Sequence, residues 1–578
     1  MEAMNEAKLG GVKAWLIHFR EMHGRSPRVL HIGNIANNAY NNAKILIEAG
    51  FECDVICYDY YHIMGCPEWE DADFENTLKD DFFPNWRELD LKGFTRPKWF
   101  VQGPAALCLA YLHAKNSGDL RRASRLWRVL SLFNRTMPFG IRKVWTELSP
   151  NLIVTLQHWF KSVQLPRRLH RLMTLESKKL AEVLLKRSEP LLGRFAATLA
   201  VRGFISVRGV VSGTANWLQT TGRKLLKLNA STDTDCNGYE IKPSMYRKLL
   251  EKWAKEFPKG CIPPQYDELS AHPASSNEWI RLLKHYDIVI GYSTDPVYPM
   301  LANVPYFAFE HGTLRHIPYQ DDLQGRLAAA AYHEAAHVFV TNFDCVASAE
   351  RLVGQRYTFI NHPFDDQHGQ YVKGGAEQRK LLQRRLDADL LFFFPTRQDW
   401  VEGTGYADKS NDVFFRAMAK LRVSGYRIGV VCCNWGRNVA QSKELISFLG
   451  LKAHVEWMPP LPIIPFERMC MAADIVADQF KLGAFGGVVF KAMAVGAPIL
   501  TYLNQDLLKA QYPALPPVIN CHTVEEIFEQ VQGMIREPVL LKSMGEKSRE
   551  WISAHHAKGD TVNLQVTQFR KLIENTLH

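Results

Sequence analysis

The sequence lacks any long apolar segment. The stretch that comes nearest to the roughly 18 uncharged apolar residues of a spanning helix, 191–218, is interrupted by Arg194, Arg202 and Arg208. Residues 1–20 mix Glu, Lys and His with apolar residues, without the continuous apolar core and small-residue cleavage site of a signal peptide. These absences predict a cytoplasmic protein with no membrane-spanning helix.

The chain also lacks the cysteine spacing of a metal site. Its 11 cysteines are odd in number, none lies in a CxxC pair, and no clear Asp-x-Asp pair ends a predicted strand. We therefore expect buried free thiols in a reducing compartment, no metal site and no cofactor. The composition, 47% hydrophobic and 22% charged, excludes a disordered chain, and 578 residues predict two or three domains.

Acidic residues are scarce in one segment. Residues 104–227 hold 22 lysines and arginines against 5 acidic residues, whereas the rest of the chain holds 48 against 55. The net charge of +10 is therefore concentrated in a basic, mostly helical insert, which we place at 104–245.

Two parts of this insert, 120–130 and 166–172, combine Arg with Leu or Trp at helical spacing. That pattern is typical of a basic amphipathic helix on an anionic membrane surface, and it predicts a peripheral position on the inner membrane face. The alternative is a helical subdomain with a solvated basic face. We expect no nucleic-acid partner, because no recognised nucleic-acid module accompanies the charge.

Short β-branched runs alternate with longer helical stretches in two blocks, which predicts an α/β fold with two parallel sheets. Strands are expected at 28–32, 53–58, 287–290, 304–309 and 338–341, and then at 390–394, 427–432, 454–457, 474–477 and 498–502. The predicted domains are 1–365, which includes the insert, and 366–555, with a hinge at 362–375. A C-terminal helix at 556–578 is expected to pack back on the first domain.

A glycine-rich turn, 483–487, opens a helix in the second block. A helix N-terminus presents free N–H groups and a positive dipole end, which suit a phosphate. Arg397 and Lys409 leave the same edge of the sheet, so together with the turn they predict a diphosphate pocket. The alternative is that the glycines only permit close packing and that the two cations are solvated.

These residues resemble a known family. Arg397, the segment Lys409-Ser-Asn-Asp, the segment Ala473-Asp-Ile-Val, and the run from Phe485-Gly to Pro498 are similar to the C-terminal domain of the retaining glycosyltransferases of family 4, the group 1 family. The resemblance covers about 390–535. Its fold is GT-B, two facing Rossmann-like domains. The N-terminal half is similar in layout, through the Gly33 turn and a strand that ends in Glu310-His-Gly.

The resemblance implies that the second domain binds a nucleotide sugar donor and that the acceptor enters from the first. We expect catalytic roles for Glu310, His311, Arg397 and Lys409, and donor-binding roles for Gly33, Asn34, Arg397, Lys409, Asp478, Gln479, Gly483, Phe485, Gly486, Gly487 and Lys491. His311 falls near the transferred sugar, where it would relay a proton or orient the donor, unless it is structural. The asparagines near Gly33 would bind sugar hydroxyls, unless they cap a helix.

Two positions depart from the family pattern. The family has acidic residues where this chain has Gly483 and Lys491, and the second of these normally accepts hydrogen bonds from the ribose hydroxyls. A lysine cannot accept a hydrogen bond. Three interpretations remain open: Asp478 or Gln479 substitutes, Lys491 meets an extra negative charge, or the site is catalytically inactive.

A competing motif, HExxH, occupies 333–337. On a helix it would place two imidazoles on one face, as zinc peptidases require. The surrounding sequence argues against a zinc site, because 338–341 is a predicted strand and no third metal ligand is evident.

The resulting expectation is a glycosyltransferase that moves a sugar from a nucleotide-diphosphate sugar to a glycan or lipid-linked acceptor, retaining and metal-independent, in surface polysaccharide or glycolipid synthesis. The alternative is a catalytically silent GT-B protein that binds a nucleotide sugar or a glycan. The sequence does not identify the base, the sugar or the acceptor.

Overall fold

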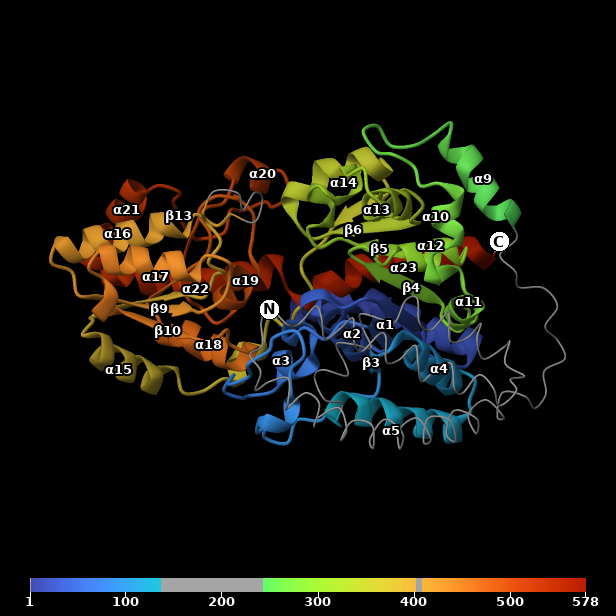
Figure 1. The fold of residues 1–578 in the computed structure, drawn as a ribbon, viewed down its shortest axis with the longest axis horizontal. Helices are drawn as coiled ribbons and strands as arrows, with labels where there is room; N and C mark the ends of the chain where they lie inside the picture. Colours follow the sequence, from blue (N-terminus) through green and yellow to red (C-terminus); the bar gives the residue numbers. More distant parts are fainter. Residues whose placement is uncertain (1, 137–242, 402–407, 578) are drawn as a thin grey trace, which may run out of the picture. The chain divides into compact units, whose positions relative to one another are not determined.

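Two parallel β-sheets form the frame of the computed structural model, which describes residues 2–136, 243–401 and 408–577 (Figure 1). The first sheet has seven strands in the order β3-β2-β1-β4-β5-β6-β7. Its strands are β1 (Arg28–Ile32), β2 (Glu52–Tyr58), β3 (Phe100–Gly103), β4 (Ile288–Tyr292), β5 (Phe307–Phe309), β6 (His337–Val340) and β7 (Tyr357–Phe359). The helices of this domain are α1 (Glu2–His23), α2 (Asn38–Ala49), α3 (Pro67–Asp71), α4 (Ala105–Asn116), α5 (Leu120–Thr136), α9 (Pro243–Trp253), α10 (Tyr266–Ser270), α11 (Asn277–Leu283), α12 (Val297–Leu301), α13 (Leu323–His333) and α14 (Val346–Val353).

The second sheet has six strands in the order β10-β9-β8-β11-β12-β13. Its strands are β8 (Leu390–Phe394), β9 (Ile428–Cys433), β10 (Val455–Met458), β11 (Ile475–Ala477), β12 (Ile499–Thr501) and β13 (Ile519–Asn520). Its helices are α15 (Gly375–Leu386), α16 (Asn411–Val423), α17 (Val439–Phe448), α18 (Ile463–Ala472), α19 (Gly487–Ala494), α20 (Gln505–Lys509), α21 (Val524–Arg536) and α22 (Pro538–His555), and the last helix of the chain is α23 (Lys558–Leu577).

Burial on both faces explains why these short apolar runs become central strands. Every residue of β4 and of β9 is buried, and helices supply separate apolar clusters to the two faces of each sheet. The prediction of two Rossmann-like α/β domains is confirmed. Strands β3, β7 and β13, which have two to four residues each and lie at the edges of the sheets, were not predicted.

Residues 104–136, the described start of the basic segment, pack onto the first domain. Helix α5 buries Ala123, Leu126 and Leu130 in the same apolar cluster that holds one face of the sheet. Its opposite side exposes the arginines Arg121, Arg125 and Arg128. The apolar face that would enter a membrane is therefore already covered by protein, and the alternative of a solvated basic face describes this helix. The segment 166–172 lies outside the described residues.

The last helix lies on the first domain. Figure 1 shows α23, in red, among the elements of the first sheet, and Phe569 is fully buried in the cluster formed with α1 and α2. Gln565 and Asn42 exchange two side-chain hydrogen bonds of 2.8 Å. The chain thus passes between the domains twice, once at 360–374 and once at 556–557. The two passages are joined, because Asn361 Nδ2 donates to the carbonyl of His555 at 2.5 Å.

The HExxH motif is divided between two elements. Helix α13 ends at His333, and His337 is the first residue of β6. Glu334 accepts hydrogen bonds from Lys252 and from the indole of Trp253, and His337 contacts Thr358 Oγ1 at 2.8 Å. Within the described ranges, no three His, Cys, Asp or Glu side chains are arranged to hold a metal ion. The motif therefore forms an ordinary helix-to-strand junction.

In the part of the chain that the structure describes, no helix is both long enough and apolar enough to cross a bilayer. The ten cysteines of these ranges are free, and nine of them are buried.

Truncation of Phe569 tests the attachment of α23. The ring packs against Phe307, Phe51 and Phe339, with centroids 5.1, 6.1 and 6.3 Å away. We expect Phe569→Ala to cost about 3–5 kcal/mol and to lower the midpoint of thermal unfolding by several degrees. The exposed residue Lys571 of the same helix provides the control, since Lys571→Ala removes no buried contact. Equal midpoints for the two variants would contradict this packing.

Candidate functional site

A cavity of about 440 Å³ lies where strands of both sheets end. Its lining includes residues just beyond β1, β5, β6 and β7 of the first sheet and beyond β8, β9, β10 and β11 of the second: Ile35, His311, Asn342, His362, Pro395, Trp435, Pro460 and Gln479. Parallel strands all end at one edge of their sheet, so the loops of each domain converge there. The cavity therefore has the position of a ligand site in α/β proteins.

The second domain supplies a lysine and a buried amide. Lys409 Nζ donates to Gln479 Oε1 at 2.7 Å, and Gln479 Nε2 donates to the carbonyl of Ala484 at 2.5 Å. Burial lowers the pKa of Lys409, an effect that Asp478 opposes and that the positive charges of Arg397 and Arg315 reinforce. Arg397 and Arg315 are thus each close enough to repel the charge of Lys409, and an anion placed beside Lys409 would relieve that repulsion.

The glycine turn brings a helix N-terminus to the same cavity. Gly486 is the residue before α19, and Gly487 and Val488, the first two residues of α19, line the cavity. A side chain at 486 would collide with the carboxylate of Asp478, so this close approach requires glycine. Asp478 is buried beneath the turn and accepts a hydrogen bond of 2.7 Å from Thr396 Oγ1. It supports the turn and does not line the cavity.

Glu310 and its partners shape the wall from the first domain. The Glu310 side chain is fully buried and accepts hydrogen bonds from the backbone of Gly312 and from Asn342 Nδ2 at 3.1 Å. Burial raises the pKa of this carboxyl group. Arg315, which lines the cavity, is fixed by a bidentate contact with Asp344 at 2.6 and 3.0 Å. Glu310 therefore fixes the loops that contain Gly312 and Asn342, and Arg315 supplies the positive charge on this wall.

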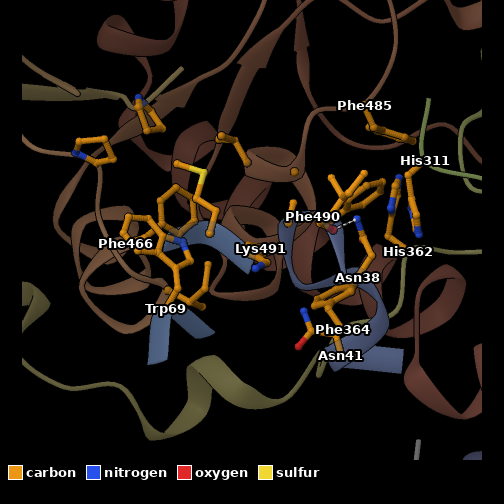
Figure 2. A pocket seen from close by; sticks show the side chains of 18 of the residues that line it. Asn38, Asn41, Trp69, His311, His362, Phe364, Phe466, Phe485, Phe490 and Lys491 are labelled. Atoms are coloured by element: carbon orange, nitrogen blue, oxygen red, sulfur yellow. Dashed lines mark hydrogen bonds between the residues drawn. The ribbon is translucent and has the colours of Figure 1, made fainter. Parts of the chain in front are cut away.

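Two histidines lie together on this wall. The rings of His311 and His362 are stacked with centroids 5.9 Å apart, and both residues line the cavity (Figure 2). Both ring nitrogens of His311 lack a hydrogen-bond partner among the described residues. Burial lowers the pKa of His311 far below its usual value and that of His362 to about 4. At neutral pH each ring is therefore uncharged and can both donate and accept a hydrogen bond.

Gly33 and Asn34 lie behind the cavity wall. Gly33 has a φ of 87° and sits against the carboxylate of Asp295, so no side chain fits there. The amide of Asn34 donates to Asn37 Oδ1 at 3.0 Å and to the carbonyl of Gly65 at 2.9 Å, and its oxygen accepts from the backbone at Tyr40. Its polar atoms are thus engaged within the protein, although neither Asn34 nor Asn37 makes a side-chain capping hydrogen bond. Asn38 and Asn41 line the cavity instead.

Arg397 and Gly483 also lie outside the lining. The Arg397 guanidinium is partly exposed and pairs with Asp399 at 3.0 Å, although its charge is felt at Lys409. Gly483 has a φ of 73° in the turn, and its carbonyl accepts a hydrogen bond from the backbone of Asn504. Phe485 does line the cavity, where its ring packs on Phe490 at 4.7 Å.

Lys491 meets a negative charge from the other domain. Its Nζ lies 2.9 Å from Oε1 of Glu70, a residue of α3, and both side chains line the cavity. Asn41 Nδ2 donates to the same oxygen at 2.9 Å. Lys491 is therefore paired with a carboxylate of the first domain.

One end of the cavity is apolar and aromatic. Figure 2 shows Trp69 and Phe466 together on one side of Lys491, with His311 and His362 on the other. The remaining apolar side chains of the lining include Met64, Trp435, Leu461 and Ile463. A ligand that fills this space has an apolar planar part at one end and polar groups toward the histidines.

Six of the residues expected from the sequence line the cavity: His311, Lys409, Gln479, Phe485, Gly487 and Lys491. The others, Gly33, Asn34, Glu310, Arg397, Asp478, Gly483 and Gly486, lie behind or beside it. Sequence reasoning missed Trp69, Glu70, Arg315, His362 and Phe466. Only His362 had a local signal, because it opens the predicted hinge segment, 362–375.

Two parallel-sheet domains with a cavity at their strand ends are the architecture expected for GT-B proteins, and comparisons with known sequences find proteins named glycosyltransferases. The D-inositol 3-phosphate glycosyltransferase of Rhodococcus opacus (strain B4) is 27% identical over 148 residues, 24% of this chain and 33% of that protein. The enzyme of the same name from Mycolicibacterium smegmatis (strain ATCC 700084 / mc(2)155) is 27% identical over 176 residues, 29% of this chain and 40% of that protein.

The chain thus spans between a third and two fifths of the length of these curated relatives. The resemblance to glycosyltransferases that the motifs predict is confirmed over the matched segment. No protein-family profile matches the chain.

Solved structures with a similar arrangement include Anabaena Alr3699/HepE in complex with UDP, with a TM-score of 0.41 and 13% identity over 51% of this chain and 82% of that one. Sucrose-phosphate synthase (tll1590) from Thermosynechococcus elongatus gives a TM-score of 0.41 and 13% identity over 55% of this chain and 81% of that one.

The charge state of His362 can be measured directly. Because burial lowers its pKa from 6.5 to about 4, we expect its ring to stay neutral at neutral pH and to take up a proton only near pH 4. Histidine selectively labelled with ¹³C, followed by NMR as the pH is lowered, reports this, and His362→Gln identifies the resonance. A titration midpoint near 6.5 would show that the ring is solvated and not part of the wall.

Proposed function

We propose that the protein is a glycosyltransferase that moves a sugar from a nucleotide-diphosphate sugar to an acceptor hydroxyl. The observation that carries the proposal is the convergence of Lys409, Arg315 and the N-terminus of α19 on one cavity. Cations and a helix N-terminus suit a diphosphate, and the apolar end with Trp69 and Phe466 suits a nucleobase. The relatives that share sequence with this chain are named glycosyltransferases.

In this proposal the chain acts mainly by electrostatic stabilisation. When the bond between the sugar and the diphosphate breaks, negative charge grows on the leaving phosphate. Lys409 and Arg315 line the cavity with fixed positive charge, and the α19 N-terminus adds oriented N–H groups. Arg397 lies near enough to lower the pKa of Lys409 and adds to the positive potential. The proposed transfer is retaining and metal-independent.

The acceptor would enter from the first domain, where His311, His362 and Asn38 line the cavity. Neutral imidazoles and an amide form hydrogen bonds with hydroxyl groups without adding charge. We propose a glycan or lipid-linked acceptor, and a role in surface polysaccharide or glycolipid synthesis. The basic residues of 104–227 would hold the protein peripherally at an anionic membrane surface by charge.

Replacement of Lys409 tests the catalytic proposal. We expect Lys409→Ala to lower the rate of nucleoside diphosphate release from the cognate sugar donor by roughly 100- to 1000-fold, because one stabilising charge on the leaving group is lost. Arg397→Ala is expected to lower it less, since Arg397 lies beside the cavity. Release is measured with purified protein, a panel of nucleotide sugars and an acceptor mixture.

Lys481→Ala is the matched control for this experiment. Lys481 is exposed, pairs with Asp408 and does not line the cavity, so its loss should leave the rate within about twofold of the unmodified protein. Donor binding without release from any nucleotide sugar would favour the silent binding module. Absence of donor binding would contradict both the transferase and the silent nucleotide-sugar binding module.

Vesicle flotation tests the membrane proposal. We expect the full chain to float with vesicles that contain phosphatidylserine and not with neutral phosphatidylcholine vesicles, and we expect 0.5 M salt, roughly three times the physiological concentration, to release it. Charge alone is invoked because α5 buries its apolar face. Equal partitioning into both kinds of vesicle would exclude an electrostatic attachment.

A further inference from the structure

Only one of the two carboxylate oxygens of Glu70 accepts a hydrogen bond from the described part of the protein. Its Oε1 accepts both hydrogen bonds, from Lys491 Nζ and from Asn41 Nδ2, each 2.9 Å long. Its Oε2 accepts none from the part of the chain that the structure describes. The side chain is 9% exposed and lines the cavity. One oxygen of a largely buried carboxylate on the cavity wall thus has no donor from the described protein, and it is open to water or to a donor group of a ligand.

Glu70 is held in its ionised form. Burial alone would raise its pKa, but the ammonium group of Lys491, the charge of Lys44 and the Asn41 hydrogen bond lower it below the usual value. An ionised carboxylate only accepts hydrogen bonds, and hydrogen bonds to a charged acceptor are stronger than neutral ones. A ligand group that contacts Oε2 must therefore be a hydrogen-bond donor. A hydroxyl group fits, whereas a phosphate is repelled.

The neighbours of Glu70 indicate which hydroxyl groups these are. Trp69, the preceding residue, and Phe466 lie on one side of Lys491, and His362 lies on the other (Figure 2). The charge of Arg315 acts on His362 and on Lys409, so the cationic groups that suit phosphate lie toward His362. In a nucleotide the ribose joins the aromatic base to the phosphates. The group that lies between an aromatic end and the cations is then the ribose, with its adjacent 2′ and 3′ hydroxyls.

We propose that Glu70 of the first domain accepts hydrogen bonds from the ribose hydroxyls of the nucleotide, and that Lys491 of the second domain is the positioning residue that fixes this carboxylate. The proposal rests on the proposed function, since it assigns a part of the donor to a part of the same cavity. It makes the nucleotide site a joint product of both domains, in which an acidic residue from one domain faces a lysine from the other.

Binding of nucleotides with and without ribose hydroxyls tests the assignment. Isothermal titration of the full chain with UDP, GDP and ADP identifies the preferred base, and the 2′,3′-dideoxy form of that diphosphate is then compared. We expect the dideoxy form to bind the unmodified protein roughly 10- to 100-fold more weakly, as expected when hydrogen bonds to a charged group are lost. In Glu70→Gln this preference should fall to about threefold or less.

Asp71→Asn is the matched control. Asp71 is the next residue of α3 and also pairs with a lysine, Lys44 at 2.6 Å, but it does not line the cavity. The control should keep the full preference for the ribose form. Lys491→Gln should reduce that preference, and Lys491→Arg should restore most of it, because arginine can hold the same carboxylate. A purely structural loss would weaken both ligands equally.

The outcomes separate the two proposals. If the unmodified protein binds none of the three diphosphates, the proposed function fails and this assignment fails with it. If it binds one of them and Glu70→Gln keeps the full preference for ribose, the assignment of Glu70 is overturned while the proposed function stands. Loss of the preference in Glu70→Gln but not in Asp71→Asn supports the assignment.

Discussion

The constraint on which the site depends is the parallel pairing of all strands in both sheets. Parallel strands need a return crossover after each one, so every strand of a sheet ends at the same edge. Chain segments far apart in sequence are brought together there: residues 35, 311, 342 and 362 from one sheet, and 395, 435, 460 and 479 from the other. The sheet topology thereby determines which chain segments lie together at this edge, and the loop sequences determine which side chains those segments carry.

The fold could be predicted because its signals are local. Apolar β-branched runs, the glycine turn and helix 411–423 fall where the sequence pattern places them, and α16 has those bounds. Lining residues were predicted where a local motif marks them, as with Lys409 and with Gly487 and Lys491 on α19. Glu70 and Arg315 could not be predicted, because each acts through a partner that folding brings near: Lys491 is 421 positions away from Glu70. The periodicity of the sequence carries no signal of such a long-range pair.

Charge inside the cavity is arranged differently from charge on the surface. The buried Glu70–Lys491 pair is flanked by an amide, and the neighbouring histidines are held neutral by burial, so the protein limits the charge that it leaves unpaired in a place of low polarity. The exposed arginines of α5 have no such constraint. The net charge of +10 therefore combines two separate sets of charges, one buried around the cavity and one facing solvent.

The return of α23 to the first domain has a mechanical consequence. The polypeptide crosses between the domains at 360–374 and again at 556–557, and the two crossings are tied to each other through Asn361 and His555 and through Asp366 and the backbone of Lys558. Residues 362–364 of the first crossing also line the cavity. Any separation of the domains would therefore pivot at these crossings, beside the cavity itself, and it would break the contact between Glu70 and Lys491.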